Sequence, residues 1–123
     1  MDKESIIKNV LNKLDKWVLD SEVKNGNLSD LDYNKCVTEE EVLHYYNLTI
    51  DYAKSYTGNY EIELIPVASS AIIMWCAGLL WKKYNVRSNS QIDETFTIGY
   101  GDSLIIQAKE MLKPFKVYGL YAY

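Results

Sequence analysis

The feature that most constrains the fold is an uncharged stretch of 18 residues from Leu64 to Trp81, LIPVASSAIIMWCAGLLW. Its length is near the minimum for a helix that crosses a membrane. In such a helix, however, Ser69 and Ser70 would lie near the middle of the bilayer without hydrogen-bond partners. The segment after Asp102 offers no second span, because charged and polar side chains interrupt its apolar residues. We therefore expect a helix at the centre of a water-soluble helical protein.

A second stretch, Thr95–Asp102, reads TFTIGYGD and is close to the TVGYG selectivity filter of potassium channels. A filter requires a pore helix before it and a spanning helix after it. The preceding segment KKYNVRSNSQIDE is polar and lacks helical periodicity, and no second span follows, which excludes a channel. We interpret Gly99 and Gly101 as flanking a tight turn between a strand and a helix, with Asp102 as the helix N-cap.

The composition narrows the functional classes. The chain has 123 residues, enough for one domain, and its net charge of -4 argues against a surface that binds phosphates. Cys36 and Cys76 lack metal-site spacing and are expected to be reduced thiols of a cytosolic protein without an export signal. Tyrosine is the commonest aromatic residue, with 11 copies beside 3 Trp and 2 Phe. This abundance suits protein interfaces, although a compositional bias of the source genome would explain it equally well.

The spacing of apolar residues predicts four helices, with approximate bounds 3–19, 38–55, 66–84 and 102–113. Thr38 and Glu41 form a capping box at the start of the second helix, and Thr57-Gly58-Asn59 ends it. Pro66 suits the first turn of the third helix, and Pro114 follows the fourth. The side chains expected to face the core are Ile7, Val10, Leu11, Leu14, Trp17, Val18, Val42, Tyr45, Tyr46, Thr49, Ala53, Val67, Ala68, Ala71, Ile72, Met74, Trp75, Gly78, Leu79, Leu104, Ile105, Ala108, Met111 and Leu112.

The predicted fold class is therefore all-α, a small bundle of about four helices in a single domain. Residues 1–20 hold the N-terminal helix, and residues 38–114 form the core bundle. Residues 86–100 alternate loosely between apolar and polar side chains and predict a short β-hairpin or extended flap between the last two helices. Residues 115–123 follow Pro114 and predict an extended, aromatic C-terminal arm.

Catalytic and ligand-binding motifs are not evident in the sequence, which predicts no enzyme, no cofactor and no metal. His44 has no nucleophile in a recognisable motif and is interpreted as a solvated or capping residue. The acidic groups Asp93 with Glu94 and Glu39 to Glu41 lack the alternating oxygens of a cation loop. The chain also lacks GxGxxG and GxxxxGK[ST] phosphate loops.

The order of segments from about Val37 to Lys116 resembles the head-tail connector, or adaptor, proteins of long-tailed bacteriophages and prophages. The matching segments are the helix VTEEEVLHYYNLTIDYAKSYTG, the small-residue-rich helix PVASSAIIMWCAGLLWKKYNV, the flap SQIDETFTIGYGDS and a final helix closed by LKPFK. The resemblance implies a ring of twelve copies below the portal in the virion neck, after assembly in the host cytoplasm. This ring would extend the DNA channel, so that DNA passes without specific binding, and would hold the next head-completion or tail protein.

Two segments are candidate contact sites under this interpretation. The flap is expected to contact ring neighbours or the next protein through Gln91, Ile92, Asp93, Glu94, Phe96, Ile98 and Tyr100. The arm is expected to bind the portal protein as an added strand through Phe115, Lys116, Val117, Tyr118, Leu120, Tyr121 and Tyr123. The alternative for the arm is that it folds back over the helices of its own domain.

Two other functional classes remain open at this stage. Small helical prophage proteins are often nucleic-acid-binding regulators, but the acidic charge and the scarcity of basic residues in the last helix argue against this class. A self-contained helical scaffold or enzyme subunit is the third class. A gel shift with duplex DNA and a measurement of oligomeric state would separate these alternatives.

Overall fold

The computed structural model of the chain describes residues 2–14, 18–19, 36–88 and 94–117. Within these ranges the protein is an all-α bundle of four helices, α1 (Lys3–Asn12), α3 (Glu39–Thr57), α4 (Ser69–Ser88) and α5 (Glu94–Leu112). Short 3-10 turns cover Ile62–Leu64, Pro66–Ala68 and Lys113–Phe115. A two-residue parallel pair, β1 (Val18–Leu19) with β2 (Cys36–Val37), links the end of α1 to the start of α3. The predicted fold class is confirmed.

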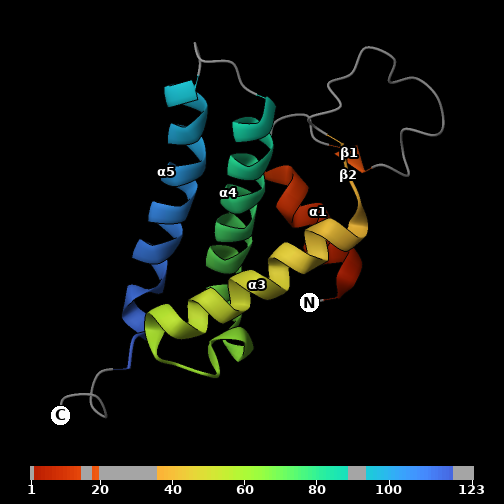
Figure 1. Ribbon diagram of the computed structural model, residues 1–123. Coiled ribbons are helices and arrows are strands. Elements are labelled where there is room, and N and C mark those ends of the chain that lie inside the picture. The colour runs from red at the N-terminus through yellow and green to blue at the C-terminus, as the bar shows by residue number, and fades with distance from the viewer. Residues whose placement is uncertain (1, 15–17, 20–35, 89–93, 118–123) are drawn as a thin grey trace.

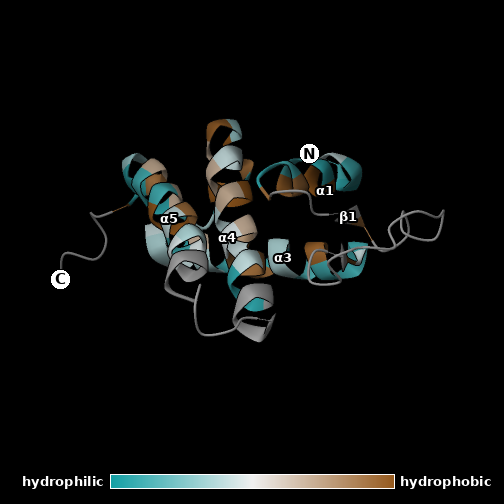
Figure 2. Ribbon diagram, turned by 90° about the horizontal axis from the view of Figure 1, so that it is seen from above, coloured by the Kyte–Doolittle hydropathy of each residue, from teal (hydrophilic) through white to brown (hydrophobic). Residues whose placement is uncertain are grey.

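Helix α4 is the centre of the bundle. Figure 1 shows α4 and α5 side by side, with α3 inclined across their lower ends, and Figure 2 shows α4 between α5 and α1. Because α4 is covered on several sides, side chains around much of its circumference are buried. Among the described helices, none is both long enough and apolar enough to span a bilayer.

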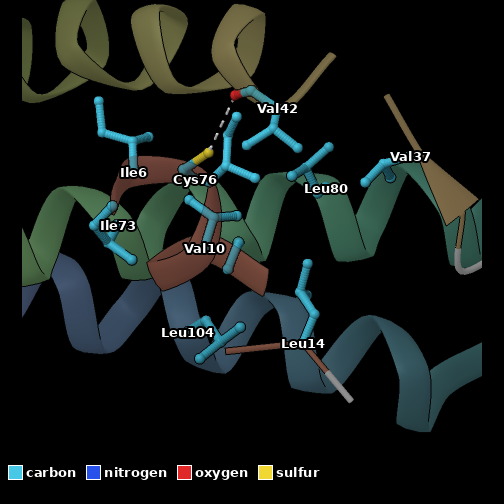
Figure 3. Close-up of a cluster of buried hydrophobic side chains, with 11 residues drawn as sticks. Ile6, Val10, Leu14, Val37, Val42, Ile73, Cys76, Leu80 and Leu104 are labelled. Carbon is cyan, nitrogen blue, oxygen red and sulfur yellow. Dashed lines mark hydrogen bonds between the residues drawn. The ribbon is translucent and has the colours of Figure 1, made fainter. Parts of the chain in front are cut away.

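The core consists of two clusters on either side of α4. The first joins α4 to α1, α3, β2 and α5 and contains Ile6, Ile7, Val10, Leu14, Val37, Val42, Ile73, Cys76, Ala77, Leu80 and Leu104 (Figure 3). The second joins α4 to α3 and α5 and contains Ala53, Ile62, Ala68, Ala71, Ile72, Trp75, Ala108 and Leu112. Most of the side chains predicted to face the core are buried, but Val67 and Met111 are exposed.

The predicted ends of α3 are confirmed. The Thr38 Oγ1 atom accepts a hydrogen bond from the Glu41 backbone N–H at 3.0 Å, as the capping box predicts. The Glu41 carboxylate also pairs with the Lys83 ammonium on α4. At the other end Gly58 adopts the left-handed conformation with φ 70°, and its N–H donates to the Lys54 carbonyl at 2.8 Å.

The two glycines at the α4–α5 contact have a different role from the one predicted. Helix α5 runs through Gly99, Gly101 and Asp102 without a turn. A Cβ atom on Gly78 would lie 2.8 Å from the Gly101 carbonyl oxygen, and a Cβ on Gly101 would lie 3.0 Å from the Gly78 carbonyl oxygen. The predicted turn with Asp102 as N-cap is therefore wrong, because Gly101 serves close packing of two helix backbones.

Helix α5 also replaces much of the predicted flap. It begins at Glu94, and α4 continues to Ser88, so the structure leaves only residues 89–93 between them, outside the described ranges. The apolar residues of the FTIGY segment suggested a strand, but the close contact of α5 with α4 favours the helix. The prediction of an extended flap is thus wrong for residues 86–88 and 94–100.

Helix α1 is shorter than predicted. It begins after Asp2, whose carboxylate accepts from the Ser5 N–H at 2.8 Å, and ends at Asn12. The Leu14 N–H donates to the Leu11 carbonyl at 3.0 Å in a closing turn, and the side chain of Leu14 is buried. Val18, predicted to be helical, lies in β1, and Trp17 lies outside the described residues.

Candidate interaction surfaces

A groove of about 520 Å³ lies on the side of the bundle formed by α3, α4 and α5. We call it the aromatic groove, and its lining residues are Tyr52, Trp75, Leu79, Lys82, Asp102, Ile105, Ile106 and Lys109. Tyr52 comes from α3, the next three come from α4, and the last four come from α5. The groove therefore exists only where three helices meet.

Stacked aromatic rings form one wall of the aromatic groove. The Tyr52 and Trp75 rings lie parallel within 27°, with centroids 6.1 Å apart. The Tyr56 ring contacts the same indole edge-on, at 6.1 Å. Trp75 is buried, whereas 42% of Tyr52 is exposed, so Tyr52 forms most of the aromatic surface that this wall presents to solvent.

Cationic side chains border this aromatic wall. The Lys109 Nζ atom lies 5.4 Å from the Trp75 ring centroid and 5.7 Å from that of Tyr56, and the Lys116 Nζ atom lies 4.3 Å from the Tyr56 centroid. At the other end of the groove Lys82 forms an ion pair with Asp102 at 2.7 Å. The end near Lys109 thus places an ammonium group beside aromatic rings.

A second apolar surface projects from the loop between α3 and α4. The side chains of Tyr60, Leu64 and Val67 are 73%, 71% and 67% exposed, and we call them the loop tip. The 3-10 turns at Ile62–Leu64 and Pro66–Ala68 bury Ile62 and Ala68, and this direction of the chain turns Leu64 and Val67 outward. The loop tip is therefore held on an ordered scaffold.

The first residues of the predicted arm are fixed to their own domain. The Val117 N–H donates to the Thr57 carbonyl at 2.8 Å, and the Asn59 side-chain amide donates to the Phe115 carbonyl at 3.4 Å. The ring of Phe115 packs against the second core cluster, and Lys116 lies over Tyr56. For residues 115–117, the expectation of an arm that reaches out of the domain is therefore wrong. Tyr118, Leu120, Tyr121 and Tyr123 lie outside the described residues.

The residues that were predicted to make contacts from the flap do not lie together in an exposed loop among the described residues. Gln91, Ile92 and Asp93 lie outside the described residues, while Glu94, Phe96 and Ile98 belong to the first turns of α5. The Tyr100 hydroxyl donates to the Lys13 carbonyl at 2.9 Å, and its ring meets Trp81 edge-on at 4.6 Å. Tyr100 thus connects α5 to α4 and to the end of α1 while its side chain stays partly exposed.

The reactive side chains that are described sit in unremarkable surroundings. Cys76 is a free, buried thiol whose Sγ atom lies 3.9 Å from the Val42 carbonyl, and burial raises its pKa to about 12. His44 is exposed and meets Tyr45 edge-on. Within the described ranges, no three His, Cys, Asp or Glu side chains are grouped closely enough to hold a metal ion.

Neither the aromatic groove nor the loop tip was predicted from the sequence. Tyr52 and Tyr56 lie four residues apart, a spacing that places them on one face of α3, but their contact with Trp75 depends on how α3 crosses α4. Val67 was assigned to the core because the run around it is apolar. In the structure Pro66–Ala68 form a 3-10 turn and α4 begins only at Ser69, so Val67 is turned outward instead of facing the core.

Comparisons with known proteins do not identify a relative. No family model, no curated protein and no solved structure matches this chain. A functional proposal therefore rests on the surfaces described above and on the order of segments in the sequence.

Proposed function

We propose that this protein is a structural head-tail connector subunit of a long-tailed bacteriophage or prophage. In this role, copies form a ring of twelve in the virion neck, join the portal protein to the next neck or tail protein, and extend the DNA channel. The proposal begins from the order of helices in the sequence, and it describes a non-enzymatic protein that acts through its surfaces.

The aromatic groove is the observation that most favours an assembly role. Its wall of Tyr52 and Trp75 and the 60% exposed Ile106 combine the aromatic and aliphatic groups that carry binding energy at protein interfaces. Exposed apolar groups in a small domain mark interaction sites when they are gathered in one hollow. A ring subunit needs such surfaces on each of its two lateral sides.

The portal contact is proposed for the chain after Val117. Phe115, Lys116 and Val117 are occupied by contacts with α3, so they serve as the base of the arm. Tyr118, Leu120, Tyr121 and Tyr123 follow this base and supply four large apolar side chains in the sequence. An extended segment of this composition suits addition to a partner's sheet edge.

Co-purification with the portal protein encoded in the same genome tests this proposal. We expect the full-length chain to be retained on immobilised portal and to appear as a ring in negative-stain images of the complex. A chain that ends at Val117 should keep its helical content and lose retention. The absence of any portal complex with the full-length chain would overturn the connector proposal.

A further inference from the structure

The loop tip and the aromatic groove both expose apolar side chains. The loop tip carries three large apolar side chains that are about 70% exposed. The aromatic groove is concave, with a volume of about 520 Å³ and a lining that includes Leu79, Ile105 and Ile106. Water contact with both surfaces is unfavourable, and insertion of one into the other would remove apolar area from both.

The charges near the two surfaces are also complementary. Glu61 is an exposed acid within the loop that carries the tip, whereas its neighbour Glu63 pairs with Lys54 at 3.0 Å. The Lys109 ammonium lies beside the aromatic wall of the groove, 5.4 Å from the Trp75 ring centroid. An acidic loop that approaches this end of the groove is therefore attracted, while a basic one is repelled.

The loop tip and the aromatic groove have no residue in common. The loop tip precedes the first turn of α4, whereas the groove lining on α4 runs from Trp75 to Lys82, roughly 10 to 20 Å along the helix at 1.5 Å per residue. Figure 1 places the loop at the foot of the bundle, with α4 and α5 rising away from it. The two surfaces are different patches, so a contact between them joins copies head to tail.

We infer that the loop tip of one copy inserts into the aromatic groove of the next copy. This inference rests on the proposed function, and it names the lateral contact from which a ring would be built. Leu64 and Val67 enter the groove near Ile106, and Glu61 faces Lys109. Because the contact is heterologous, it closes into a ring if the rotation between copies permits and otherwise continues as a filament.

Mixing two variants tests the contact. Leu64→Asp disables the tip and Ile106→Asp disables the groove, and both side chains are exposed enough for the fold to tolerate the change. Sedimentation velocity of the full-length wild-type chain should show concentration-dependent self-association. Each variant alone should associate at least about 30-fold more weakly, the range of a buried interface anchor. The two variants mixed should form one-to-one dimers and nothing larger, because only one tip and one groove remain intact.

A charge exchange provides the matched control. Glu61→Lys and Lys109→Glu should each weaken association about tenfold, and the chain that carries both should recover it. A wild-type chain that stays monomeric at every concentration, or variants that associate as the wild type does, would overturn the inference. Portal capture is measured separately, so self-association through these surfaces without portal capture would reject the connector function and keep the contact.

Discussion

Single glycines set the distance between α4 and α5, and this role can be measured. A Cβ on Gly78 would lie 2.8 Å from both the Gly101 carbonyl oxygen and the Ile105 Cγ1 atom. Because a backbone oxygen cannot move aside as a side chain can, Gly78→Ala must push the helices apart. We expect it to lower the free energy of unfolding by about 1–3 kcal/mol in urea titrations followed by circular dichroism.

Gly99 in the same stretch provides the control for this substitution. A Cβ on Gly99 would meet no atom within 4 Å, so Gly99→Ala should stabilise the helix by roughly 0.5–1 kcal/mol. Equal effects at Gly78 and Gly99 would contradict the close-packing interpretation. The sequence alone could not separate these two glycines, because the difference depends on which face of α5 meets α4.

The buried thiol of Cys76 gives a pH-dependent prediction at the same scale. Burial raises its native pKa to about 12 from an ordinary value of 9.0. The unfolded thiol ionises first, so this stability is fully present below about pH 9 and is lost as the pH rises from there to 12. In a Cys36→Ser background, Cys76→Ala should reduce the loss of unfolding free energy at alkaline pH, by about 1 kcal/mol at pH 10. Parallel curves of unfolding free energy against pH for the two chains would reject this assignment.

At the scale of elements, local signals were enough for α3 but not for α5. The capping residue Thr38 and the stop residue Gly58 act within a few positions along the chain, and the structure confirms both. The start of α5 depends on contact with α4. The residues before Gly99 have a high strand propensity, so the sequence predicted an extended segment there instead of a helix. Likewise, α1 ends at Asn12 although its apolar spacing continues, because β1 pairs with β2 instead.

Truncation of the C-terminal segment tests whether residues 115–117 are held by their own domain. A chain that ends at Lys113 loses the packing of Phe115 and the hydrogen bond from Val117 to Thr57. We expect its free energy of unfolding to fall by about 1–3 kcal/mol, the range for loss of a packed group. A chain that ends at Val117 keeps these contacts and should stay within about 0.5 kcal/mol of full length. Equal stability of the two truncated chains would show that residues 114–117 do not anchor the arm.

At the scale of the whole molecule, the abundance of tyrosine was equally compatible with protein interfaces and with a compositional bias of the source genome, and it could not place any surface. The abundance of tyrosine was consistent with interfaces, yet only the crossing of α3 over α4 brings Tyr52 and Tyr56 to Trp75. The loop tip likewise depends on a turn that exposes Leu64 from within an apolar run. Surfaces built from several elements are not encoded in any single segment, which is why the pattern of the sequence predicted the bundle better than its contacts.

The charge of the whole molecule predicts that duplex DNA is not retained, as the proposed role in a DNA channel would require. The net charge is -4, and among the described lysines, Lys3, Lys54, Lys82, Lys83 and Lys113 each lie within 4.0 Å of a carboxylate. Lysines that face carboxylates have less positive potential to offer a phosphate backbone. In a gel shift at about 50 mM salt, a condition that favours electrostatic binding, we expect no complex at micromolar protein. A shift that weakens tenfold or more at about 200 mM salt would instead support the nucleic-acid-binding alternative, because such a slope reports phosphate contacts.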